Sequence, residues 1–205
     1  MLGHTHALFG LGALVTVELV ARQVLEPGLV QPHQVRGAPV GLALCAGAAI
    51  LGALAPDLDA EEATIQHEMG LASELIQGVL LLVGVKHRGV LHSGLASLMV
   101  LVLGVFIGWR VGYPDVGLAF GLGYLSHVAM ADALTIHGVP LLWPMKTQFH
   151  LLPQGLRVQT GSPVEGLIFL AGMLLLIGLF FLYPDLIPPE LVRWIRQSLS
   201  GMVIT

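Results

Sequence analysis

The sequence predicts an all-α integral membrane protein, a helical bundle of about five transmembrane helices with one further helix that is interfacial or re-entrant. Hydrophobic residues make up 55% of the 205 residues and charged residues only 11%. The mean hydropathy of +0.83 is too high for a soluble domain. Several apolar runs also reach the ~17–25 residues that a helix needs to cross a bilayer. We expect residues 1–205 to form a single membrane-embedded domain.

Five segments are long and apolar enough to be membrane spans. No Lys or Arg precedes the first one and no small-residue cleavage site follows it, so we interpret it as a retained helix rather than a signal peptide. In the third and fourth, glycines four residues apart, Gly104 with Gly108 and Gly117 with Gly121, indicate closely packed helices. The predicted spans are residues 7–21, 38–55, 90–109, 116–134 and 164–183.

Between the second and third spans, residues 75–85 form an apolar run of about half the length that a ~30 Å crossing needs. Glu74 and Lys86 flank this run. We interpret it as an interfacial or re-entrant helix, with a sixth span as the alternative. The choice matters because every span moves the chain to the opposite side of the membrane.

With five spans, most histidines and carboxylates near membrane depth fall on one side of the bilayer. Such groups are costly there and normally turn inward to pair or to bind ions. We therefore expect side chains from five segments to converge on one site. The candidate metal ligands of this site are His6, Asp57, Asp59, His87, His92, His127 and Asp132.

Imidazole and carboxylate ligands together suit divalent transition metals, zinc first. Seven candidate ligands exceed the four of a tetrahedral site, so we expect two or more Zn²⁺ ions, with Mn²⁺ as the alternative. In two-metal sites the ions activate water and clamp the attacking and leaving oxygens of a phosphoryl transfer. Arg88, in "HRGVLHS", is suited to bind a phosphate oxygen. The sequence favours a membrane-bound metal-dependent hydrolase, a phosphoesterase acting on a lipid or lipid-linked phosphate.

Two other functional classes remain open. The same cluster could be the ion path of a metal or proton transporter, although transport sites usually lie near the midplane and these residues gather at one edge. The chain could also be a catalytically silent membrane scaffold. A nucleic-acid partner is not expected, because the net charge is −4 and the nine Lys and Arg residues are scattered. Ser93 and Ser126 are weak nucleophile candidates, since neither lies in a Gly-x-Ser-x-Gly motif.

The start of the fifth span, "SPVE", has the pattern of a helix capping box. Ser162 would be the N-cap, Pro163 the first helical residue and Glu165 the third, where its carboxylate caps the helix. From the residues alone, Glu165 is therefore predicted to be a capping residue.

Several motifs, in chain order, resemble the YdjM-like family of LexA-regulated inner-membrane proteins. They are "HALFG", "APDLD", "HRGVLHS", "GYLSH" followed by "DALT", and "GVPLLWP". The resemblance implies a metal-dependent hydrolase in the bacterial inner membrane, with a more distant likeness to zinc-dependent phospholipase C proteins. It implies that the seven candidate ligands are functional. It also makes Glu165 a candidate catalytic residue, in addition to Arg88.

Two motifs depart from the family pattern. "APDLD" continues as "AEE" where the family has His-Pro-Lys, so that histidine is missing here. The family also tends to separate the His and Asp of the fourth span by four positions, whereas "HVAMAD" separates His127 from Asp132 by five. On a regular α-helix these two would point about 140° apart. A π-bulge would bring both to one face; otherwise only one of them is a ligand.

The cations give a small bias in sidedness. Five cations lie on the face opposite the predicted site, and four lie on the same face as the site. Two of these four, Arg88 and Lys86, could be held by the carboxylates of the site. Short cytoplasmic loops collect Lys and Arg, so we expect the site to open to the periplasm or cell exterior. The two sets are Arg22, Arg36, Arg110, Arg193 and Arg196, against Lys86, Arg88, Lys146 and Arg157.

Overall fold

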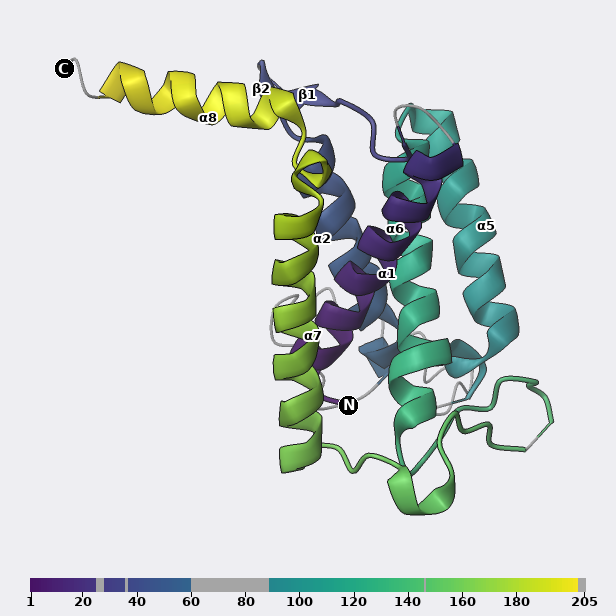
Figure 1. The fold of residues 1–205 in the computed structure, drawn as a ribbon. Coiled ribbons are helices and arrows are strands. Elements are labelled where there is room, and N and C mark those ends of the chain that lie inside the picture. Colours follow the sequence, from purple (N-terminus) through teal and green to yellow (C-terminus); the bar gives the residue numbers. More distant parts are fainter. Residues whose placement is uncertain (25–27, 36, 60–88, 146, 203–205) are drawn as a thin grey trace.

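The structure, a computed structural model, describes residues 1–24, 28–35, 37–59, 89–145 and 147–202, and these form a helical bundle (Figure 1). Four of the described helical segments are long and apolar enough to cross a membrane, and a shorter apolar helix accompanies them. The predicted helical membrane bundle is confirmed. The four are α1 (Gly3–Val24), α5 (Gly94–Val111), the segment Pro114–Leu134 that begins with α6 (Pro114–Ser126), and α7 (Pro163–Leu182), and the shorter one contains α2 (Gly41–Leu54).

Helix α6 lies at the centre and contacts α1, α2 and α5. Glycine makes these contacts close, as the spacing in the sequence predicts. A Cβ atom at Gly104 of α5 would lie 2.6 Å from the carbonyl oxygen of Gly117 on α6, and one at Gly121 would lie 2.5 Å from Leu101. Gly123 of α6 approaches the backbone of Ala49 on α2 in the same way. Any larger residue at these positions would push the helices apart.

The second and third spans begin later than predicted. Before α2, β1 (Gln34–Val35) and β2 (Ala38–Pro39) pair as an antiparallel hairpin, and Gly37 in its turn has a φ of 81°, which favours glycine. Before α5, Val90–His92 forms a 3₁₀ turn, η2. The helix itself starts at Gly94, because the hydroxyl of Ser93 caps it by accepting from the N–H of Ala96 at 3.1 Å.

An amphipathic helix, α8 (Pro189–Met202), follows α7 and was not among the predicted helices. It turns away from the direction of α7 and extends out from the bundle (Figure 1). Leu191, Ile195 and Leu199 recur at four-residue spacing on one face, while Arg193 and Arg196 lie on the other. This pattern is typical of helices that lie in the membrane interface.

The two ends of the bundle are built differently. At one end lie the start of α1, the 3₁₀ turn η1 (Ala55–Asp59) after α2, η2 before α5, the last turns of the α6 segment and the start of α7 (Figure 1). The hairpin and α8 lie at the other end. The predicted gathering of the polar segments at one end is confirmed. The predicted interfacial helix at 75–85 lies outside the described residues.

Candidate metal centre

Five of the predicted ligands meet at this end of the bundle, brought together from four separate turns or helix ends. His6 comes from the first turns of α1, Asp57 from η1, His92 from η2, and His127 and Asp132 from the end of the α6 segment. Their side chains are at most 1% exposed, except that of Asp57, which is 23% exposed. The cluster is thus buried but accessible beside Asp57.

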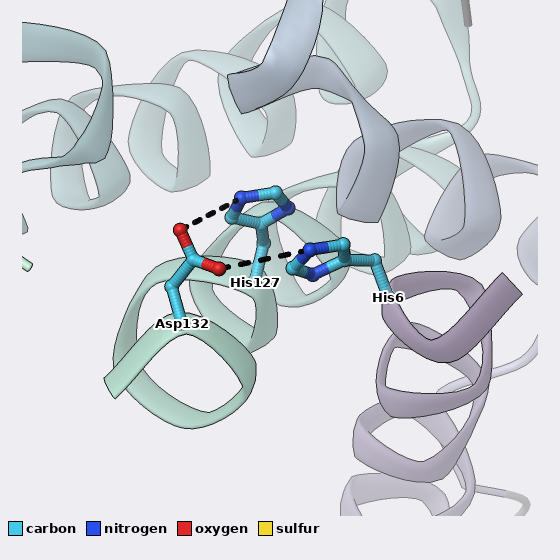
Figure 2. A group of neighbouring side chains, drawn as sticks. All are labelled: His6, His127 and Asp132. Carbon is cyan, nitrogen blue, oxygen red and sulfur yellow. Dashed lines mark ion pairs between the residues drawn. The ribbon is translucent and has the colours of Figure 1, made fainter. Parts of the chain in front are cut away.

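A π-helix brings His127 and Asp132 to the same face. Residues His127–Ala131 form the π turn η3, and the N–H of Asp132 donates to the carbonyl of His127, five residues earlier. Because this turn takes in one extra residue, side chains five apart line up. The Oδ2 atom of Asp132 lies 3.6 Å from Nε2 of His127 (Figure 2). The π-bulge considered from the sequence is present, and both residues can face one ion.

The ligand atoms around His92 and His127 have the spacing that a tetrahedral ion requires. Zinc lies ~2.0–2.2 Å from N and O ligands, which puts neighbouring ligand atoms roughly 3.3–3.6 Å apart. The two Nε2 atoms are 3.3 Å apart. Asp57 Oδ1 lies 3.3 Å from Nε2 of His92 and 3.5 Å from that of His127, and Asp132 Oδ2 lies 3.6 Å from each. The donor set therefore fits a divalent ion.

His127 is held in the tautomer that binds a metal. Its Nδ1–H donates to the carbonyl oxygen of Ala53, at 2.6 Å, so the lone pair of the neutral ring is on Nε2 and faces the cluster. Metal-binding histidines usually have such a partner on their second nitrogen. Next to His92, the hydroxyl of Tyr124 donates to the backbone carbonyl of Leu91, at 2.7 Å, and so holds the η2 turn. The role of the Ala53 carbonyl was not predicted, since a backbone carbonyl carries no signal of its own in the sequence.

His6 faces the other oxygen of each carboxylate, Asp57 and Asp132. Its ring stacks on that of His127, with centroids 3.8 Å apart. Its Nε2 is 3.7 Å from Asp132 Oδ1 (Figure 2) and 3.8 Å from Asp57 Oδ2, the oxygens that do not face His92. This nitrogen also donates to the carbonyl of Met1, at 3.1 Å. Binding a cation through Nε2 therefore requires His6 to give up that bond.

Of the remaining predicted site residues, the structure describes the side chain of Glu165. The backbone of Asp59 belongs to η1. His87 and Arg88 lie outside the described residues. Glu165 is buried, but its carboxylate accepts from the N–H groups of Leu2, at 2.6 Å, and Gly161, at 2.7 Å.

The capping role predicted for Glu165 is thus partly confirmed. Ser162 is the N-cap and Pro163 follows it, and the Ser162 hydroxyl accepts from the N–H of Glu165 at 3.4 Å. In a capping box the Glu165 carboxylate would accept from the N–H of Ser162, but here that N–H donates to the carbonyl of Gln159. The carboxylate instead joins the start of α7 to the start of α1. Its catalytic role stays a prediction.

The other polar residues at this end have local partners, as the sequence suggests. The hydroxyl of Ser126 donates back to the carbonyl of Gly123, at 2.7 Å, and that of Ser93 donates to Val90, at 2.6 Å. Both hydroxyls thus serve their own turns, as expected of weak nucleophile candidates. His4 and His137 are exposed.

A second buried polar cluster lies at the opposite end of the bundle and was not predicted. Glu18 accepts from Nε of Arg22, at 2.6 Å, and from the backbone N–H groups of Leu29 and Val30, at 2.9 and 3.1 Å. Asp115 pairs with His33, at 2.8 Å, and accepts from the N–H of Gln31 at 2.9 Å. The four-residue spacing of Glu18 and Arg22 was the available signal. Here each carboxylate is matched by a cation or an N–H donor.

The fold and the cluster define a helical integral membrane protein with a buried His/Asp group able to hold metal ions at one end. A family model described as YdjM inner membrane protein matches residues 1–186. The chain is also 34% identical over 159 residues to the inner membrane protein YdjM of Escherichia coli (strain K12) and to that of Shigella flexneri, which covers 76% of this chain and 75% of each relative. No solved structure matches it significantly.

The chain belongs to the YdjM inner membrane protein family. The family resemblance found in the sequence motifs is thus confirmed, and so is the location in the inner membrane.

Proposed function

We propose that this protein is a membrane-bound metal-dependent hydrolase, a phosphoesterase that acts on a lipid or lipid-linked phosphate. The observation that supports this most is that the Nε2 atoms of His92 and His127 lie 3.3 Å apart and that one oxygen each of Asp57 and Asp132 lies 3.3–3.6 Å from both of them. Two of these atoms are imidazole nitrogens and two are carboxylate oxygens, the ligand types that divalent transition metals prefer.

The two carboxylates are arranged to serve two ions. Asp57 and Asp132 each turn one oxygen toward His92 and His127 and the other toward His6. One ion would lie among His92, His127 and the first pair of oxygens, and a second between His6 and the other pair. When bound, such ions activate water and neutralise charge on a phosphate group. Zn²⁺ suits these ligands best, with Mn²⁺ as the alternative.

The protein's own residues would position the reaction. The Ala53 carbonyl keeps His127 in one orientation, which holds the ligand set without reorganisation. The exposed edge of Asp57 is the side from which a substrate can reach the cluster. Arg88, predicted from the sequence, would bind a phosphate oxygen in a bidentate manner. Because the cluster lies at an end of membrane-length helices, its substrate would be a head group at the bilayer edge.

The transporter alternative is less well supported. Transport sites typically lie near the bilayer midplane at broken helices. Here all five clustered residues come from helix ends and 3₁₀ or π turns at one end of the bundle. This position favours an enzyme facing one side.

Metal analysis of purified protein tests the proposal. We expect at least one equivalent of zinc or manganese after gentle purification and reloading, together with chelator-sensitive hydrolysis of phospholipid or lipid phosphate. An Asp115→Asn variant is the matched control, because Asp115 is also a buried carboxylate but lies at the other end. Less than one equivalent of metal would contradict the metal site. Zinc movement into proteoliposomes without any turnover of ester would favour the transporter.

A further inference from the structure

An apolar groove of about 660 Å³ runs between α1, α6 and α7. Ligand pockets typically measure ~300–1,000 Å³, so this groove has the size of a binding site. It is wide because α7 stands away from the bundle: of the residues of this helix, all of them described, Glu165 alone is buried. The bonds of Glu165 hold α7 at the end near the cluster, and the helix diverges from there.

The groove begins beside the candidate metal centre. Phe9 follows His6 by three residues on α1, and Ala129 and Met130 belong to the same π turn as His127. On α7 the lining starts at Ile168, three residues after Glu165. A molecule lying in the groove would therefore have one end next to the cluster.

The lining offers hydrocarbon contact and no polar recognition. Sixteen side chains or backbone segments line it, and the polar ones among them are Thr16 and Ser126. Both hydroxyls donate to their own helix, Thr16 to Gly12 and Ser126 to Gly123, each at 2.7 Å. Small residues, Gly12 and Gly172 among them, leave the space open. The occupant must therefore be apolar along this whole stretch.

The length of the groove matches one leaflet. Its lining on α7 extends from Ile168 to Leu179, eleven residue steps or roughly 16 Å at ~1.5 Å per residue. Half of a ~30 Å hydrocarbon core is ~15 Å. An acyl chain of the leaflet nearest the cluster would fit this length, whereas a long isoprenoid chain would extend well beyond it.

We propose that this groove binds one acyl chain of a glycerophospholipid and thereby presents the head group of that lipid to the His/Asp cluster. The inference rests on the proposed phosphoesterase function and names its substrate class. Since bilayer and groove are equally apolar, the hydrophobic effect does not favour one over the other. The gain comes from packing and orientation, so the groove acts chiefly on the rate with membrane substrate.

Gly12→Leu fills the groove and is the test. A Cβ at Gly12 has no atom within 4 Å, and the same is true of Gly47 on α2, which is outside the groove, so Gly47→Leu is the matched control. Leucine favours helix more than glycine does, so neither variant should impair folding. The first readout is the phospholipid retained by detergent-purified protein, measured by native mass spectrometry. The second is kcat/KM for a long-chain phospholipid and for a water-soluble short-chain analogue.

We expect Gly12→Leu to lose retained phospholipid and to lower kcat/KM for the long-chain substrate by about tenfold, as a misfit in an apolar pocket does. The short-chain analogue and the Gly47→Leu variant should be unaffected. Retention equal to wild type, an equal loss with both substrates, or an isoprenoid phosphate retained in place of phospholipid would each overturn the inference. If no variant hydrolyses any ester while Gly12→Leu alone loses lipid, the groove stands and the proposed function fails.

Discussion

The two ends of this bundle each bury carboxylates and histidine, but they compensate charge in different ways. At the hairpin end, Glu18 meets Arg22 and two backbone N–H groups, and Asp115 meets His33 and a third N–H. At the other end, the imidazole and carboxylate atoms face one another around a common centre. A cluster whose charges are matched by fixed donors stabilises the fold. At the cluster end the ammonium of Met1 lies 3.4 Å from Asp132 Oδ1, and the other ligand atoms converge in a way that suits a metal cation.

The largest effect is expected at the hairpin end. Glu18→Ala removes the partner of Arg22 and leaves the N–H groups of Leu29 and Val30 without their acceptor. We expect the free energy of unfolding to fall by roughly 3–5 kcal/mol with no change in bound metal. Denaturant titration in detergent and metal analysis measure the two quantities. Glu190→Ala is the control, because that exposed pair with Arg193 should be worth at most ~1 kcal/mol.

At the cluster end, Asp132→Asn should act on bound metal, the quantity that Glu18→Ala leaves unchanged. The amide keeps the shape of the side chain but removes the negative charge that faces His6, His92 and His127. We expect metal affinity to fall by at least ~100-fold, the upper range for loss of a supporting residue. Competition with a zinc-binding dye measures it. Equal losses of metal in Asp132→Asn and Asp115→Asn would mean that the two ends do not differ as described.

A smaller effect is expected for His6→Ala. His6 donates a hydrogen bond from its Nε2–H to the carbonyl of Met1 and faces the carboxylate oxygens that point away from His92. We expect this variant to lose the more weakly held ion, with an affinity change of about tenfold, and to keep the one at His92 and His127. His4→Ala, two residues earlier on the same helix and exposed, is the control. Loss of all metal in His6→Ala would show a single, indivisible centre.

The last prediction assigns each end to a side of the membrane and involves no change in stability. In a variant lacking Cys45, a cysteine at Gln148, exposed at the cluster end, should react with an impermeant thiol reagent in intact spheroplasts. A cysteine at Gln34, exposed in the hairpin, should not react, because the arginine-rich face is expected to be cytoplasmic. The reverse labelling pattern would place the candidate metal centre in the cytoplasm.

Much of the site could be inferred from the sequence because membrane topology limits where a residue can lie. Once the spans are identified, helix ends that share a side must meet, so the pattern of spans alone groups His6, Asp57, His92, His127 and Asp132. The start of α5 was misplaced because hydropathy continues through Val90 and Leu91, although Ser93 is the N-cap and the helix begins at Gly94. The hairpin cluster was missed because, besides Arg22 and His33, its donors are backbone groups of residues 29–31.

By itself the sequence determined the membrane class, the helical bundle and the set of residues at one end, since these depend on the length and composition of continuous segments. Only the tertiary structure decided which carboxylates face the histidines and which cap a helix. Glu165 joins α1 to α7, and His127 aligns with Asp132 through the π turn beside the Ala53 carbonyl. These outcomes depend on distances between segments far apart in the chain, and such distances are set by how closely the glycine-lined helices pack.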